Sequence, residues 1–419
     1  MLHGPSIRGQ HQVMACQAMS EAAVIAIKSK GLIDRLVGFN TVSRESNLAL
    51  IDFIRTYLAG YGVESELHFN ETRDKANLFA TIGPRDRGGV VLSGHTDVVP
   101  TEGQNWTKPP FEMVEEDGRL YGRGTADMKS FIAVVLALVP DFVKMELQLP
   151  IHLAFSYDEE IGCLGVRSLL ASLSQRPIKP IACIIGEPTE MQVVSGHKGK
   201  MAMRCKVHGT EGHSAYAPYG VNAIEYAAKL INRLSQLGEK LAEGEINPRF
   251  DPPFSTLQTG TIQGGRALNM IPGECRFDFE VRTLPLFDPQ CVADDIKHFA
   301  QQELLPKMQK KSAASDISFD LLSSYPGLDS PDDLSIVRLL KMIMGSERAE
   351  TVSYGTEGGL FTAAGIPTVV CGPGSMAQGH QPDEFIAVAQ VALCEQFLQR
   401  LGATLCSLDH SILLAPDNK

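Results

Sequence analysis

Histidines and carboxylates accompany apolar runs at five places in this sequence of 419 residues. The segments are VVLSGHTDVVP, GRGTADMKSFIAVV, IHLAFSYDEEIGCLG, IACIIGEPT and GPGSMAQGHQPDEF, and they supply His95, Asp127, Glu160, Glu187 and His380. Imidazole and carboxylate groups together suit zinc, or another divalent metal such as cobalt or manganese. Each motif alone is weak, since an aspartate before an apolar helix is also a typical N-cap. As a set they predict a metal site, against the alternative of scattered, solvated charges.

Three adjacent acids, Asp158, Glu159 and Glu160, end one of these apolar runs. Because neighbouring carboxylates repel one another, a compensating cation is expected unless all three are fully solvated. Asp97 follows His95 by two residues, close enough to help orient the imidazole through its second ring nitrogen. Two metals that share one carboxylate would be served by five protein ligands and a water.

Strands that alternate with helices carry these segments. We predict strands at 76–83, 89–94, 150–156, 181–186, 351–354 and 368–371, and helices at 20–39, 47–61, 128–145 and 165–173. This alternation favours an α/β fold with a mixed, mostly parallel sheet and helices on both faces. Four of the five segments place their acids or histidines at the carboxyl end of a predicted strand, where open α/β sheets bind ligands.

A different pattern occupies residues 193–324. The predicted order is strand 200–208, helix 222–237, strand 255–263, strand 274–283, helix 289–308 and strand 317–322. This βαββαβ order matches a ferredoxin-like unit. It predicts a small domain inserted into a metal-binding catalytic domain made of 20–192 and 325–410. Residues 1–19 contain no acid and lack the apolar block of a signal peptide, so we expect a disordered extension there.

Composition excludes several classes of function. The net charge of −11 argues against non-specific binding to nucleic acid or to an anionic membrane. No apolar run approaches the roughly 20 residues that span a bilayer. The nine cysteines are odd in number and none has CxxC spacing, so we expect reduced thiols in a cytoplasmic protein. The sequence contains no GxSxG motif, and the metal chemistry requires no serine or cysteine nucleophile.

The motifs SGHTDVVP, DGRLYGRGTADMK, DEEIGCLG, GEPT, GTEGHSA and GHQPDEF follow one another over about residues 30–400. In this order they resemble the zinc-dependent amidohydrolase and exopeptidase family of acetylornithine deacetylases, succinyl-diaminopimelate desuccinylases, aminoacylases and carboxypeptidases. The resemblance implies two divalent metal ions, most simply zinc with cobalt as the alternative. It also implies an inserted lid domain through which two copies form a homodimer.

The resemblance also divides the ligands between the two metals. Asp127 would bridge them, His95 and Glu187 would complete one site, and Glu160 and His380 would complete the other.

Further roles follow from the same resemblance. Glu159 would be the general base, and Asp97 would orient a ligand histidine. His213 would reach the active site of a partner subunit and steady the oxyanion, while Asn269 and Arg282 would bind substrate, Arg282 through a bidentate carboxylate contact. By residue type alone, a strand-end histidine, a turn asparagine and a surface arginine are the favoured interpretations of these last three.

The stretches AFSYDEEIGCLGVRSLL, GVNAIEYAAKLI and CGPGSMAQGHQPDEFI are most similar to the acetylornithine deacetylases. The implied reaction is hydrolysis of N2-acetyl-L-ornithine to L-ornithine and acetate, a step of arginine biosynthesis. Glu357 stands where desuccinylases have a small neutral residue, and we expect it to favour a substrate with a free side-chain amine. The alternative for Glu357 is a glutamate stabilised by a helix N-terminus.

Other functions remain open at this stage. A broader acylamino-acid hydrolase, a succinyl-diaminopimelate desuccinylase or a dipeptidase would use the same residues. A metal-binding protein without catalysis would instead require a missing base or a missing ligand, and the sequence retains all of them.

Overall fold

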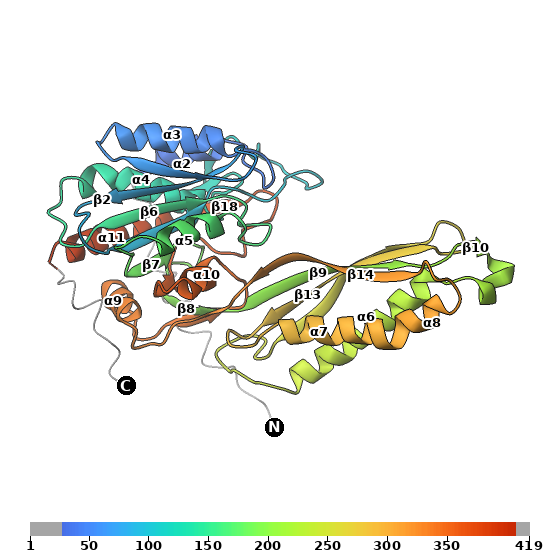
Figure 1. Ribbon diagram of the computed structural model, residues 1–419. Helices are drawn as coiled ribbons and strands as arrows, with labels where there is room; N and C mark the ends of the chain where they lie inside the picture. The colour runs from blue at the N-terminus through green and yellow to red at the C-terminus, as the bar shows by residue number, and fades with distance from the viewer. Residues whose placement is uncertain (1–26, 408–419) are drawn as a thin grey trace, which may run out of the picture.

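The computed structural model describes residues 27–407 and has two lobes (Figure 1). The large lobe holds a nine-stranded sheet between helices, and the small lobe extends from it as a four-stranded sheet with helices on one face. The extension expected at 1–19 lies outside the described residues. Within the described part of the chain, no helix is long and apolar enough to cross a membrane, and the cysteines are free.

The sheet of the large lobe has the order β1-β2-β6-β3-β7-β17-β8-β15, with β16 beside β8. Its strands are β1 (Ser65–Phe69), β2 (Ala76–Ile82), β3 (Val90–His95), β6 (Ile151–Ser156), β7 (Ala182–Ile185), β8 (Val194–His197), β15 (Leu328–Asp329), β16 (Glu350–Val352) and β17 (Thr368–Val370). The central strands β6, β3, β7 and β17 run parallel, whereas β1 and β2 add antiparallel pairs at one edge. The predicted mixed sheet with a parallel centre is confirmed.

Alternate residues of the central strands face two different hydrophobic cores. On β3, Val90 and Leu92 belong to one core and Val91 to the other, as the two-residue period of a strand requires. The first core is closed by α2 (Lys30–Val37), α3 (Leu48–Ala59), α4 (Lys129–Phe142), α9 (Ser335–Met344) and α11 (Val388–Leu405). The second core is closed by α5 (Val166–Ser174) and α10 (Gly358–Ala363). Helices therefore cover both faces of the sheet.

The small lobe has the strand order β11-β13-β9-β14, and every neighbouring pair is antiparallel. Its elements are β9 (Gly199–His208), α6 (Ala223–Ala242), β11 (Thr256–Gly264), β13 (Glu274–Thr283), α7 (Gln290–Phe299), α8 (Leu305–Gln309) and β14 (Asp316–Tyr325). Alternate residues of β9 and β13 pack against the helices in a separate hydrophobic core. A two-stranded ribbon of β10 (Gly212–His213) and β12 (Met270–Ile271) forms the tip farthest from the large lobe (Figure 1).

Some predicted boundaries differ from the structure by several residues. Strand β8 pairs within the large sheet, so the chain crosses to the small lobe at Lys198–Gly199 rather than at 193. The helix predicted at 289–308 is confirmed as a helical stretch over 290–309, which contains a π turn, Ala300–Leu304, just before Pro306, because proline lacks the N–H that a regular α-helix needs there. The first described helix begins at Lys30, and the part predicted at 20–26 lies outside the described residues.

Candidate metal centre

Four parallel strands bring the candidate ligands to one edge of the large sheet. His95 is the last residue of β3, Glu160 follows β6 by four residues, Glu187 follows β7 by two, and His380 lies in the loop after β17. Since neighbouring parallel strands end at the same edge, these side chains converge there. Asp127 joins them from the loop between β5 (Arg119–Tyr121) and α4.

The distances divide these five residues into two groups that share Asp127. His95 Nε2 lies 2.8 Å from Asp127 Oδ1 and 3.5 Å from Glu187 Oε1. His380 Nε2 lies 3.3 Å from Asp127 Oδ2 and 2.9 Å from Glu160 Oε2. One carboxylate thus faces both imidazoles with a different oxygen for each. This is the arrangement in which a single carboxylate can bridge two cations.

Two carboxylate oxygens of the candidate ligands lack a partner in the described part of the chain. Glu160 Oε1 and Glu187 Oε2 are buried without a hydrogen-bond partner among the described residues. A buried oxygen without a partner is costly, and an oxygen of a carboxylate more so. His95, Asp127 and Glu160 place ligand atoms within 4.8 Å of one another, as do His95, Glu159 and Glu187. The residues therefore fit divalent cations.

The pKa values of the cluster also indicate that oxygens of its carboxylates lack partners among the described residues. Burial raises the pKa of Glu160 to about 7, with Asp127 adding to the rise, and burial also raises the pKa of Glu187 well above its usual range. Burial lowers the pKa of His95, but the hydrogen bond with Asp127 and the charge of Glu187 outweigh it and raise that pKa. Hydrogen bonds with Asp127 and Glu160 raise the pKa of His380 to about 11. Protons accumulate where divalent cations would otherwise bind.

Glu159 lies on the wall of a cavity of about 300 Å³ together with the candidate ligands Asp127, Glu160, Glu187 and His380. Burial raises the pKa of Glu159 to about 8, with the charge of Glu160 contributing and His95 opposing. A carboxyl group with a pKa near neutrality can both accept and donate a proton, as general acid–base catalysis requires.

Asp97 positions the loop that carries Glu159. Its carboxylate accepts hydrogen bonds from the hydroxyl of Ser43 at 2.7 Å and from the backbone N–H of Glu159 at 3.0 Å and of Glu160 at 3.3 Å. His95 Nδ1 lies 2.9 Å from the backbone carbonyl oxygen of Asp97 but 3.6 Å from its carboxylate. The main chain of Asp97 therefore makes the closer contact with His95.

Sequence reasoning missed a buried network behind Asp127. Glu384 Oε1 accepts hydrogen bonds from three backbone N–H groups, those of Gly124, Ala126 and Asp127, at 2.8–3.1 Å. Its other oxygen pairs with Arg123 at 2.7 Å, and both side chains are 1% exposed. Gln104 links Arg123 to the backbone carbonyl of His380. The charged residues inside the motifs GRG and HQPDEF were the features of the sequence that could have indicated this network.

The predicted substrate-binding residues are not all brought to this cavity. Arg282 lines it with Lys200 and Tyr325, and its guanidinium donates to the Tyr325 hydroxyl at 3.1 Å. His213 is exposed in β10, at the tip of the small lobe (Figure 1), and the exposed Asn269 lies beside it, since its carbonyl oxygen accepts the backbone N–H of Ser214. Neither residue lines the cavity.

Glu357 precedes α10 and is 2% exposed, and it is absent from the residues that line the cavity. Burial raises its pKa to about 7, and its Oε1 has no hydrogen-bond partner among the described residues.

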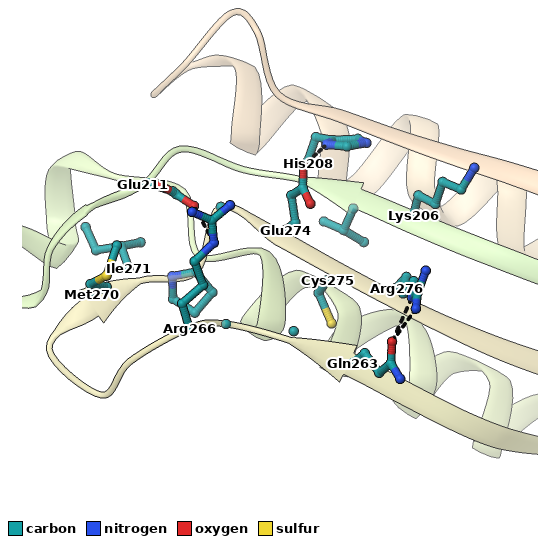
Figure 2. Close-up of a pocket in the computed structure, with 15 residues that line it drawn as sticks. Lys206, His208, Glu211, Gln263, Arg266, Met270, Ile271, Glu274, Cys275 and Arg276 are labelled. Carbon is teal, nitrogen blue, oxygen red and sulfur yellow. Dashed lines mark hydrogen bonds and ion pairs between the residues drawn. The ribbon is translucent and has the colours of Figure 1, made fainter.

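A second cavity, of about 330 Å³, lies on the small lobe between β9, β11 and β13 (Figure 2). Its charged side chains already have partners: His208 with Glu274, Arg266 with Glu211, Arg276 with Gln263, and Lys206 with Asp320. We therefore assign the chemistry to the cavity at the sheet edge, where buried oxygens lack partners.

Comparisons with known proteins agree with this geometry. The model of peptidase family M20/M25/M40 matches residues 91–403. The acetylornithine deacetylase of Proteus mirabilis is 37% identical over 363 residues, which cover 86% of this chain and 91% of that protein.

Solved structures share the fold. An M20 family metallo-carboxypeptidase from Sulfolobus solfataricus has a TM-score of 0.72 at 18% identity, covering 91% of this chain and all of that one. A dinuclear metal-binding peptidase of the M20 family from Bacillus subtilis has a TM-score of 0.60 at 16% identity, covering 90% and 98%.

Proposed function

The chain belongs to peptidase family M20/M25/M40 and is a metal-dependent hydrolase, and from this premise we propose that it hydrolyses N2-acetyl-L-ornithine to L-ornithine and acetate. The observation that carries the proposal is the similarity to acetylornithine deacetylases, at 34–37% identity over most of both chains. The product, ornithine, would serve arginine biosynthesis. A carboxylate-lined cavity beside Arg282 is consistent with a substrate that carries a free carboxylate and an amine.

We propose that the centre holds two divalent ions, with Asp127 between them, His95 and Glu187 on one side, and Glu160 and His380 on the other. Zinc is the proposed metal, with cobalt as the alternative. Support comes from the two groups of distances and from the buried oxygens without partners. Such ions polarise the substrate carbonyl and lower the pKa of a bound water to about 7.

In the proposed mechanism the chain supplies the proton transfers. Glu159 takes a proton from the attacking water and then gives it to the leaving amine, and its raised pKa suits both steps. Asp97 keeps Glu159 in place by accepting its backbone N–H. Arg282, which lines the same cavity, holds the substrate carboxylate.

We propose further that the small lobe is a ferredoxin-like lid through which two copies form a homodimer. Its edge strand β11 has the sequence TLQTGTIQG, which contains no charge, and most of its residues are exposed. An uncharged, exposed edge strand is suited to pair with a second copy. In such a dimer His213 and Asn269 at the tip would lie close to the cavity of the partner subunit.

The test is a hydrolysis assay with added metal across four substrates: N2-acetylornithine, N-succinyl-diaminopimelate, N-acetylmethionine and a simple dipeptide. We expect the highest kcat/KM for N2-acetylornithine and loss of the activity on chelation. A preference for another substrate would replace the acetylornithine proposal with a desuccinylase, a broader acylamino-acid hydrolase or a dipeptidase. No cleavage of any of the four would refute the proposed function.

A further inference from the structure

One buried cysteine touches the residue that we propose as the general base. Cys163 Sγ lies 3.2 Å from Glu159 Oε1, in the range of a hydrogen bond from a thiol. Cys163 is fully buried, so water does not compete with the Glu159 carboxylate for the hydrogen bond from its thiol. The thiol is the only hydrogen-bond donor to the Glu159 carboxylate among the described residues.

A tight turn produces this contact. The backbone N–H groups of Gly162 and Cys163 both donate to the carbonyl oxygen of Glu159, at 2.8 and 2.7 Å, and Leu164 N–H donates to Asp158 at 3.0 Å. The closure between residues 159 and 163 brings the two side chains together. Gly162 packs on Ser323 of β14 so closely that a Cβ there would lie 2.3 Å from the Ser323 Cβ, so the turn is held from outside as well.

The main chain and the side chain of Glu159 are held by different residues. Asp97 accepts the backbone N–H of Glu159. This hydrogen bond fixes the main chain of Glu159 but leaves its side chain free to rotate. The thiol of Cys163 then fixes Oε1, which leaves Oε2 for the cavity that Glu159 lines. A proton carrier must lie within hydrogen-bond reach of the water, so this orientation decides how often Glu159 is ready to react.

We propose that Cys163 is a positioning residue whose thiol holds Glu159 with one oxygen toward the attacking water. The inference rests on the proposed function, in which Glu159 carries the proton. Nucleophilic attack and metal binding by Cys163 would both require a thiolate. Burial and the charge of Glu159 raise the pKa of the Cys163 thiol well above its ordinary value, so the proton needed for the hydrogen bond stays in place at neutral pH.

Two substitutions separate the hydrogen bond from packing. Cys163→Ala removes the donor, and Cys163→Ser keeps a donor of similar size. For Cys163→Ala we expect kcat to fall about three- to tenfold, the worth of one modest hydrogen bond, with KM and bound metal unchanged. Cys163→Ser is expected to recover most of the lost kcat. The matched control is Cys183→Ala on β7, which removes a thiol that is just as buried but has no hydrogen bond among the described residues.

An infrared measurement tests the contact without relying on activity. The S–H stretching band lies in a region free of other protein bands and shifts to lower frequency when the thiol donates a hydrogen bond. The difference between wild type and Cys163→Ser should contain a band at lower frequency than the difference between wild type and Cys183→Ala. In a Glu159→Ala background, the Cys163 band should move to higher frequency.

Several results would overturn the proposal. Wild-type kcat in Cys163→Ala would show that the bond is not needed, and equal losses in the alanine and serine variants would show that only packing matters. A Cys163 band at the same frequency as that of Cys183 would show that the bond does not form. A chain without hydrolase activity would refute the proposed function, and the infrared comparison would still decide whether the thiol holds Glu159.

Discussion

Replacing Glu384 by alanine is expected to weaken both the fold and metal binding, through separate contacts. Arg123 would be left with its charge buried, since it is 1% exposed and Glu384 is its ion-pair partner at 2.7 Å. Removing one member of a buried ion pair typically costs about 3–5 kcal/mol of stability. The three backbone N–H groups of the Asp127 loop would also lose their shared acceptor. Loss of such support for a ligand typically lowers metal affinity about 10- to 100-fold.

A double variant can separate these two effects. In Glu384→Gln with Arg123→Met, the amide oxygen still accepts the loop N–H groups, and no unpaired charge stays buried. We expect this variant to recover most of the stability, since neutral replacement of a buried pair is often harmless, and to bind metal more tightly than Glu384→Ala. The surface pair of Lys108 and Glu116 offers a control, because Glu116→Ala should change the free energy of unfolding by less than about 1 kcal/mol.

The assays are urea unfolding, for the free energy, and titration of the metal-free protein with zinc, for the affinity. The reasoning would be refuted by a Glu384→Ala protein that unfolds within about 1 kcal/mol of wild type, given the usual cost of an unpaired buried charge. It would be refuted equally if the double variant bound metal as weakly as Glu384→Ala, because the loop N–H groups would then not matter.

Three further predictions concern the cavity. Glu159→Gln should bind metal nearly normally in a titration but lose more than about 99% of turnover, since general acid–base catalysis contributes about 10²–10⁴ to the rate. A variant that keeps more of the rate would exclude Glu159 as the proton carrier. The metal-free protein should lose stability as the pH rises from about 4.5 to 8, because Glu159 and Glu160 have raised folded pKa values of about 8 and 7 and their stabilisation fades as they ionise. His380, whose pKa is raised to about 11, extends that loss to higher pH, and urea unfolding with and without zinc should show that metal removes most of the dependence. Because Glu357 is buried and does not line the cavity, Glu357→Ser should leave the preference for acyl amino acids with a side-chain amine unchanged when kcat/KM is compared across substrates, and a reduced preference would support the role expected from the sequence.

The central strands and the cluster of candidate ligands were predictable because their signals are local. An apolar run of four to seven residues that ends at or within a few residues of an acid or histidine indicates both a buried strand and the position of its carboxyl end. His95, Glu160 and Glu187 follow that rule, and the structure brings them to one edge. The parallel arrangement then follows from the alternation with helices.

Contacts between distant segments were not predictable in the same way. Glu384 and Gly124 are 260 residues apart, and nothing local to either indicates the hydrogen bond between them. Strand β8 was missed because VSGH, with a serine and a glycine at its centre, lacks the run of β-branched residues that marks a strand. The exposure of His213 depends on the length of the small-lobe strands, which places β10 at the far tip, and Asn269 lies beside it through the hydrogen bond from the backbone N–H of Ser214.

The pairing of Lys200 with Tyr325 means that the chain enters and leaves the small lobe on adjacent strands. Neighbouring strands lie about 5 Å apart, so the two ends of the insert are close together where they join the large lobe. For the large lobe the insert is therefore equivalent to a loop that connects two nearby points. Loop closure across so small a gap costs little more for a long insert than for a short one. The large lobe can therefore tolerate changes in the size and shape of the insert without altering its own sheet. Lys200 and Arg282 of the insert line the cavity together with the candidate metal ligands. Substrate specificity can therefore change through the insert while the metal ligands stay unchanged.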